Sequence, residues 1–131
     1  MGEGNPLGIG EIRTVGIPVT DQDRALSFYA GTLGFDLEMD VPLPQQGARW
    51  IVVAPPGAGT TLALVAAHEG VPAGVETGVR FHTADAGATH AAMQARGVEV
   101  GEVLRWPGVP AMFQVQDPDG NRFEIVEGSE T

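Results

Sequence analysis

The fold is decided by residues 12–40, IRTVGIPVTDQDRALSFYAGTLGFDLEMD. The opening residues alternate in polarity, and the apolar positions of this predicted strand are Val15, Ile17 and Val19. Asp21 then stands where a helix N-cap is expected. Small and apolar residues recur at helical spacing up to Gly34, which suits the left-handed residue that follows a helix. A second alternating strand begins at Phe35, so the stretch predicts strand, helix and strand.

The same order of elements recurs in residues 77–103, TGVRFHTADAGATHAAMQARGVEVGEV. Its first strand is followed by Asp85 as an N-cap, an alanine-rich helix, Gly97 as the stop and a second strand. Each stretch continues into strand, turn and strand, over residues 49–66 and 111–127. The sequence therefore predicts one β-α-β-β-β module that occurs twice.

The chain divides into four parts on this reading. We expect a flexible N-terminal lead-in (1–11), a first module (12–67), a linker marked by Gly and Pro (68–76) and a second module (77–128). The two modules together should form one domain, because 131 residues are enough for one ordinary core. The lead-in has neither the basic nor the apolar region of an export signal, so we expect a cytoplasmic protein.

The fold class follows from the balance of helices and strands. Each module has one helix and about four strands, and a helix covers only one face of its sheet. The uncovered faces must be buried in another way. We predict an α+β fold in which the two sheets turn these faces inward and form a curved, barrel-like cleft with the helices outside.

The paired layout resembles the glyoxalase/bleomycin resistance/dioxygenase family, also called the vicinal oxygen chelate superfamily. The resemblance rests on VGIPVTDQDRALSFYAGTLGF near the start and DPDGNRFEIVE at the end, and it covers roughly residues 10–128. It implies the fold predicted above. It also implies a homodimer, since edge strands of such modules often pair across a two-fold axis.

The resemblance also implies where a metal would bind. Metal-using members place ligands at four positions, which correspond here to Thr14, Ala63, Gly78 and Glu124. Only Glu124 suits a hard cation, whereas a catalytic divalent site generally has about three protein ligands. We therefore predict no metal cofactor. The alternative, a divalent metal such as Fe, Mn, Ni or Zn with Glu124 as a ligand, stays open.

Glu124 lies between Phe123 and Ile125 in the last strand and should face the cleft. Arg80 faces the same cleft from a neighbouring strand, and the two side chains can meet diagonally. We predict an ion pair between them or a shared contact with a ligand. A buried carboxylate without a partner costs several kcal/mol, and Arg80 supplies that partner without a metal. A metal ligand or an acid-base group remains a third interpretation.

Four further residues are candidates for ligand contacts. Trp50 starts a strand and could form an aromatic wall, although core packing is equally compatible with its position. Trp106 lies in a loop and is a candidate for a lid. Thr14 and His82 should face the cleft from the first and fifth strands. The other histidines, His68 and His90, are expected at the surface, and no catalytic residue can be assigned.

Composition limits the classes of partner. The net charge is −10, and all seven basic residues are arginine. Such a surface repels phosphate backbones and anionic lipid, so nucleic-acid and membrane binding are not expected. No apolar run approaches the ~20 residues that a membrane helix needs. The absence of cysteine excludes disulfides and thiolate chemistry.

These features favour a metal-independent protein that binds a small molecule. The acidic charge and an apolar cleft with few polar groups suit an apolar compound or a cationic aromatic one, which the protein would sequester. The alternative is a metal-dependent lyase, isomerase or dioxygenase with Glu124 as ligand. A third hypothesis is a metal-free enzyme with His82 or Glu124 as general base. The residues do not decide whether a reaction is catalysed.

Overall fold

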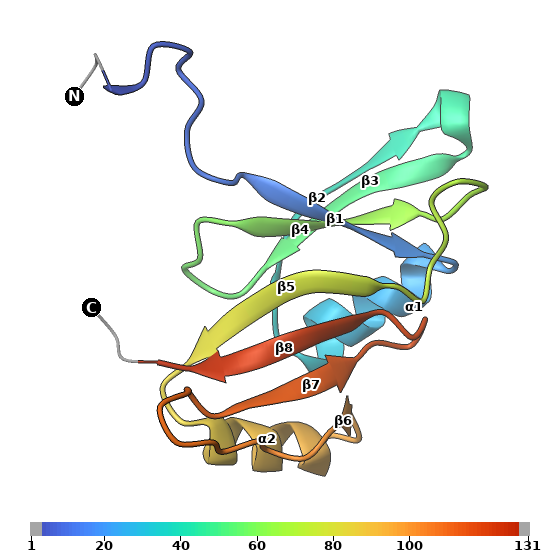
Figure 1. Cartoon of the computed structure of the whole chain (residues 1–131). Coiled ribbons are helices and arrows are strands. Elements are labelled where there is room, and N and C mark those ends of the chain that lie inside the picture. The colour runs from blue at the N-terminus through green and yellow to red at the C-terminus, as the bar shows by residue number, and fades with distance from the viewer. Residues whose placement is uncertain (1–3, 129–131) are drawn as a thin grey trace.

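A computed structural model describes residues 4–128 of the chain. These residues form two four-stranded sheets, with strand orders β1-β4-β3-β2 and β5-β8-β7-β6 (Figure 1). The strands of the first sheet are β1 (Thr14–Val19), β2 (Asp36–Leu43), β3 (Ala48–Ala54) and β4 (Thr61–Ala66). The strands of the second are β5 (Glu76–Thr83), β6 (Glu99–Val100), β7 (Met112–Gln116) and β8 (Arg122–Glu127). The predicted α+β class and the duplicated module are confirmed.

Both sheets have the same topology. The first and last strands of each module are parallel, as β1 with β4 and β5 with β8. The remaining pairs are antiparallel. The sheets are curved but are not closed into a barrel. A register shift between Leu37 and Met39 places these residues opposite Val53 and Val52 respectively, so the alternation expected from Phe35 onward is broken by a bulge.

The helices begin as the sequence predicts. The helical elements are α1 (Gln22–Leu26), a π-helix (Ser27–Thr32), α2 (Ala86–Ala95) and a 3₁₀ turn (Pro44–Gln46). Asp21 accepts a hydrogen bond from the Arg24 amide at 3.0 Å, and Asp85 accepts one from the Ala88 amide at 3.0 Å. Both aspartates are therefore the N-caps that the two repeats predict.

The first helix differs from expectation in its second half. After Leu26 the turns widen into the π-helix, and the Leu33 amide donates to the Phe28 carbonyl at 2.9 Å. Such a widened turn is rare and is found mostly as a short insertion in an α-helix. Gly34, with φ of +79°, then ends the element as predicted.

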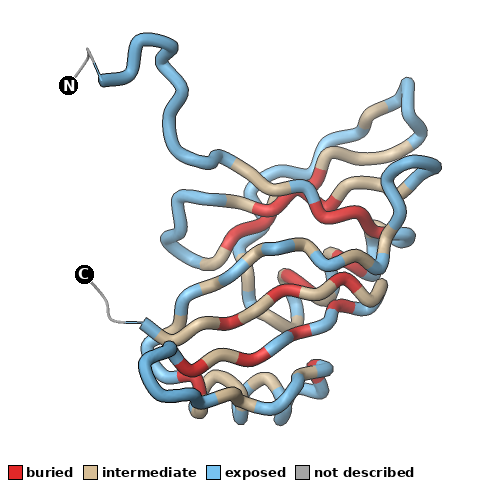
Figure 2. The backbone as a smooth tube through the Cα atoms, in the orientation of Figure 1, coloured by how far each residue is buried: buried red, intermediate tan, exposed pale blue. Residues whose placement is uncertain are grey.

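One hydrophobic core serves both modules. Figure 2 shows its buried residues along the middle of both sheets. Members from the two sheets are Ile17, Val19, Leu62, Leu64, Phe113, Val115, Phe123 and Ile125. The Tyr29 ring, from the π-helix of the first module, lies 6.4 Å from the Phe123 ring in β8. The helical segment of the first module therefore packs behind the second sheet as well, and this joins the modules (Figure 1).

The DPDGN turn before β8 connects the modules through polar contacts. The buried Asn121 accepts hydrogen bonds from the Gly74 and Val75 amides at 2.8 and 3.0 Å. Its amide nitrogen donates to the Pro18 carbonyl at 2.8 Å and to the Asp117 carboxylate at 2.9 Å. One side chain thus ties β1 and the segment before β5 to the second sheet. Within residues 4–128, no helix is long and apolar enough to cross a membrane.

Candidate functional site

The open face of the first sheet is apolar. The helical segment covers one face of this sheet, and the opposite face carries the alternate residues of each strand. In neighbouring rows these are Gly16, Ala63, Val52 and Met39, followed by Pro18, Val65, Trp50 and Val41. Met39 and Val41 are exposed although they are large and apolar. An apolar, partly exposed sheet face of this kind is typical of a binding surface.

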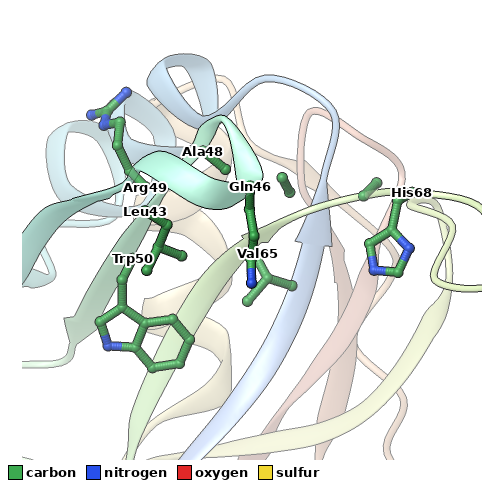
Figure 3. A pocket seen from close by; sticks show the side chains of 9 residues that line it. Leu43, Gln46, Ala48, Arg49, Trp50, Val65 and His68 are labelled. Atoms are coloured by element: carbon green, nitrogen blue, oxygen red, sulfur yellow. The ribbon is translucent and has the colours of Figure 1, made fainter.

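Trp50 stands between two hollows on this face. A cavity of about 630 Å³ lies on one side, and its apolar walls include Leu43, Trp50 and Val65 (Figure 3). A smaller one of about 210 Å³ lies on the other side and is lined by Thr14 and Met39 among others. The larger volume is within the range of small-molecule sites. The sequence-predicted candidates Trp50 and Thr14 therefore both lie at cavities of the first sheet.

Sequence reasoning missed part of this larger cavity. His68 is exposed, as expected, but it also lines this cavity, and its Nδ1 lies 2.9 Å from the Glu69 carbonyl. Gln46 also lines it, from the 3₁₀ turn that begins at Pro44. This turn joins β2 to β3, the strand that carries Trp50, and so places Gln46 beside the indole.

Arg49 forms part of the rim of the cavity, and its charge is already balanced. Its guanidinium contacts Asp23 at 2.6 Å and Asp40 at 2.9 Å. The hydrogen bond with Asp40, followed by that with Asp23, raises the pKa of Arg49, and the same contact lowers the pKa of Asp40. Figure 3 shows the Arg49 side chain directed away from Trp50. Arg49 therefore links α1 to the hairpin β2–β3 beside the cavity.

Arg80 and Glu124 form the predicted ion pair on the open face of the second sheet. Arg80 Nε lies 3.0 Å from Glu124 Oε1. The diagonal placement that the sequence suggested is wrong, because the two residues lie directly opposite each other in the parallel pair β5–β8. A register shift between Glu76 and Arg80, around Gly78 with φ of +76°, brings them into line.

This ion pair leaves one oxygen without a hydrogen bond. Glu124 Oε1 is buried, and no donor points at it within hydrogen-bond geometry in spite of the short distance to Arg80 Nε. The Arg80 side chain is 65% exposed, whereas that of Glu124 is 27% exposed. The contact is therefore an ion pair without a well-aligned hydrogen bond, since the strength of a hydrogen bond depends on its angle.

The rest of this face is also polar. Gln114 lies opposite Glu124, and Gln116 lies opposite Arg122, in the pair β7–β8. Arg122 Nε contacts Glu76 at 3.2 Å. The two open faces thus differ in character, since the first sheet presents apolar side chains and the second presents charges and amides.

The remaining two candidates line neither of the hollows beside Trp50. His82 is in β5, and its Nε2 lies 2.8 Å from the Gly128 carbonyl. Trp106 is 55% exposed in a turn in which the Val109 amide donates to its carbonyl at 3.2 Å. This turn lies in the loop between β6 and β7 (Figure 1). His90, within α2, lies 2.8 Å through Nε2 from the Gly101 carbonyl.

The four positions implied for a metal do not fit one. Thr14 and Ala63 lie on the first sheet, and Gly78 and Glu124 lie on the second. Only one of the four is a carboxylate, and residues 4–128 contain no group of three or more His, Asp or Glu side chains that could hold a metal ion. A divalent metal generally requires more protein ligands than this.

Comparison with known proteins adds to this geometry. Residues 11–125 match the model of the Glyoxalase/Bleomycin resistance protein/Dioxygenase superfamily. The chain belongs to this family. One relative is the uncharacterized protein YetH of Bacillus subtilis (strain 168), which is 34% identical over 127 residues, or 91% of this chain and 99% of YetH.

Solved structures of the glyoxalase/bleomycin resistance family are similar to the chain over nearly its whole length. TnmS3, an antibiotic binding protein from Streptomyces sp. CB03234, is 36% identical, with a TM-score of 0.83 over 94% of this chain and 99% of TnmS3. A superfamily member from Sphaerobacter thermophilus DSM 20745 is 34% identical, with a TM-score of 0.85 over 93% of this chain and all of that one. The curved, duplicated fold is therefore that of the family.

Proposed function

We propose that this protein binds a small apolar or cationic aromatic molecule at Trp50 and that it does so without a metal. The observation that carries the proposal is the cavity of about 630 Å³ beside the Trp50 indole on an apolar sheet face. Aromatic side chains stack on flat ligands and contribute a large apolar area. The similarity to TnmS3, described as an antibiotic binding protein, supports sequestration of such a compound as the role.

Two features favour a ligand with positive charge or hydrogen-bond donors. The chain carries a net charge of −10, which attracts cations and repels anions. Glu124 Oε1 is buried, and its contact with Arg80 Nε at 3.0 Å is not a well-aligned hydrogen bond, so a donor on a ligand would supply one. Glu124 would then act as the polar anchor, while Arg80 holds the carboxylate in place.

We further propose a homodimer that brings the two open faces together. Neither hollow beside Trp50 contains a residue of the second sheet, so the apolar face and the Glu124 anchor are separate in one chain. A second copy could place its polar sheet over the apolar sheet of the first. Two such contacts, related by a two-fold axis, would cover Met39 and Val41 in both copies.

Binding can be tested with a panel of planar aromatic compounds in cationic, neutral and anionic forms. A ligand at 100 times its Kd raises the free energy of unfolding by about 2.7 kcal/mol, which a thermal-shift assay detects. We expect the cationic members to give the largest shifts. Trp50→Ala should weaken binding by roughly tenfold or more, because it removes the stacking surface.

The control variant is Trp106→Ala, which removes the chain's other tryptophan from an exposed turn. It should leave the affinity close to that of the unaltered chain. Equal losses in both variants, or no shift with any compound, would contradict the proposal. Elemental analysis of protein purified without chelator tests the metal-free part, which stoichiometric Fe, Mn, Ni or Zn would overturn.

A further inference from the structure

The larger cavity at Trp50 lies where two neighbouring strands stop pairing. In the described chain, β3 pairs with β4 only at Val52 with Ala63 and at Val53 with Leu62. If this register continued, Trp50 would pair with Val65. Arg49 would likewise pair with Ala66 at the end of β4. All four of these residues line the cavity instead. The cavity therefore occupies the place where β3 and β4 diverge.

The Gln22 side chain bridges the two strands at this point. Gln22 is the first residue of α1 and is half-buried. Its Nε2 donates to the Arg49 carbonyl at 2.7 Å and to the Leu64 carbonyl at 2.8 Å. Its Oε1 accepts a hydrogen bond from the Arg49 amide at 3.1 Å. The carboxamide therefore satisfies backbone groups that β3 and β4 would otherwise satisfy for each other.

The backbone of Ala66 shows that this bridging competes with strand pairing. The Ala67 amide donates to the Val19 carbonyl of β1 at 2.8 Å. Because successive amides of a strand point to opposite edges, the Ala66 amide points toward β3. Its partner in a continued ladder would be the Arg49 carbonyl, to which Gln22 donates. The side chain and the ladder thus compete for one acceptor.

We propose that Gln22 is a positioning residue for the Trp50 site, because its carboxamide keeps β3 and β4 apart and so keeps the cavity open. Gln22 is not among the residues that line the cavity, so it acts through the backbone of Arg49, the neighbour of Trp50. The next residue of α1 strengthens this hold, since Asp23 contacts the Arg49 guanidinium at 2.6 Å. The inference rests on the binding at Trp50 proposed above.

The first experiment compares affinity with stability in Gln22→Met, whose side chain has a similar length but forms no such hydrogen bonds. The probe is proflavine, a planar aromatic cation, in a fluorescence titration. Without the carboxamide the strands can pair, which narrows the cavity and gives the backbone groups new partners. We expect the Kd of proflavine to rise by roughly tenfold or more, which is a modest loss of binding free energy. The urea midpoint should change little.

Two control variants separate this effect from a loss of stability. Gln94→Met makes the same replacement at an exposed position of α2 and should change neither quantity. Tyr29→Phe removes a buried hydrogen bond outside the cavity and should lower the urea midpoint but not the affinity. A Gln22→Met protein that loses stability and binds proflavine as before would overturn the inference, since Gln22 would then be purely structural. If Gln22→Met does not fold, Gln22→Asn replaces it, because its shorter carboxamide should also let the strands approach and raise the Kd. An unchanged Kd in that variant would count equally against the inference.

The second experiment needs no ligand. Nuclear magnetic resonance follows exchange of the Ala66 amide hydrogen with deuterium, which should slow by roughly tenfold or more in the Gln22 variant as the amide gains the Arg49 carbonyl. With Trp106→Phe in the background, Trp50 is the one tryptophan left in the chain, and acrylamide should quench its fluorescence less as the cavity narrows. Unchanged exchange or unchanged quenching would overturn the inference. Failure of the unaltered chain to bind any planar compound would instead contradict the proposed function, and these two measurements would still decide whether Gln22 keeps the strands apart.

Discussion

Tyr29 and Asp117 lie 88 positions apart in the chain and meet in a buried hydrogen bond, in which the Tyr29 hydroxyl donates to Asp117 Oδ2 at 2.8 Å. Asp117 Oδ1 accepts from the Asp119 and Asn121 amides at 2.9 Å each. Burial raises the pKa of Tyr29, and the Asp117 charge and hydrogen bond raise it further. The contact holds the helical segment of the first module against the turn of the second, and thereby fixes how the two sheets are placed.

Replacement of Tyr29 by Phe should destabilise the protein. The variant loses a hydrogen bond to a charged, buried acceptor, which contributes about 1.5–3 kcal/mol. Urea unfolding at pH 7 measures this loss. An unchanged midpoint would contradict the structural role that we assign to the hydroxyl.

The same tyrosine should make stability fall in alkali. Its folded-state pKa lies above the unfolded value of about 10. The stabilisation is therefore complete below pH 10, begins to fall above it and continues to fall as pH rises toward the folded-state pKa. Tyr29→Phe removes this dependence, so the difference in stability between the two proteins should shrink progressively as pH rises above 10. The chain has one tyrosine, so tyrosinate absorbance reports this group alone. Its titration near pH 10 in the folded protein would contradict the prediction.

Asn121→Ala should cost more than most surface substitutions. It removes partners from the Pro18 carbonyl and from the Gly74 and Val75 amides, and each unsatisfied buried group costs about 1–3 kcal/mol. We expect a loss above ~3 kcal/mol in urea unfolding. Gln114→Ala, on an exposed face, is the control and should change stability by less than about 0.5 kcal/mol.

Arg80→Ala separates a structural ion pair from a ligand anchor. Because Arg80 is largely exposed, its pair with Glu124 should contribute less than about 1 kcal/mol to stability. Glu124→Gln should keep the fold and reduce the thermal shift given by cationic ligands more than that given by neutral ones. Strong destabilisation by Arg80→Ala, with ligand shifts unchanged, would instead show that the pair is structural.

Asp40→Asn should destabilise the protein at neutral pH but not in acid. Its contact with Arg49 lowers the pKa of Asp40 in the folded state. The stabilisation is therefore present above the unfolded value of about 4 and is lost as pH falls through the folded value. Urea midpoints of the variant and the unaltered chain should differ at pH 7 and coincide at low pH. Asp36→Asn, at the start of the same strand, is the control.

The sequence by itself determined the local structure and the repeat. Alternation at Val15, Ile17 and Val19 predicted the strand and its buried face, and Asp21 predicted the helix start, because these features depend on neighbours within about four residues. The family resemblance rests on such local patterns, so the residues alone were enough to recognise it. They also identified Glu124 and Arg80 as partners across two strands.

Tertiary structure alone decided how these parts combine. The bulge at Gly78 sets Arg80 directly opposite Glu124. The turn after Leu43 brings Gln46 to the cavity at Trp50, and the segment after β4 brings His68 there. The separation of the two open faces follows from a core that the modules share on their helix sides. Each of these outcomes depends on contacts between residues distant in the chain, and a local pattern carries no information about which distant surfaces pack together.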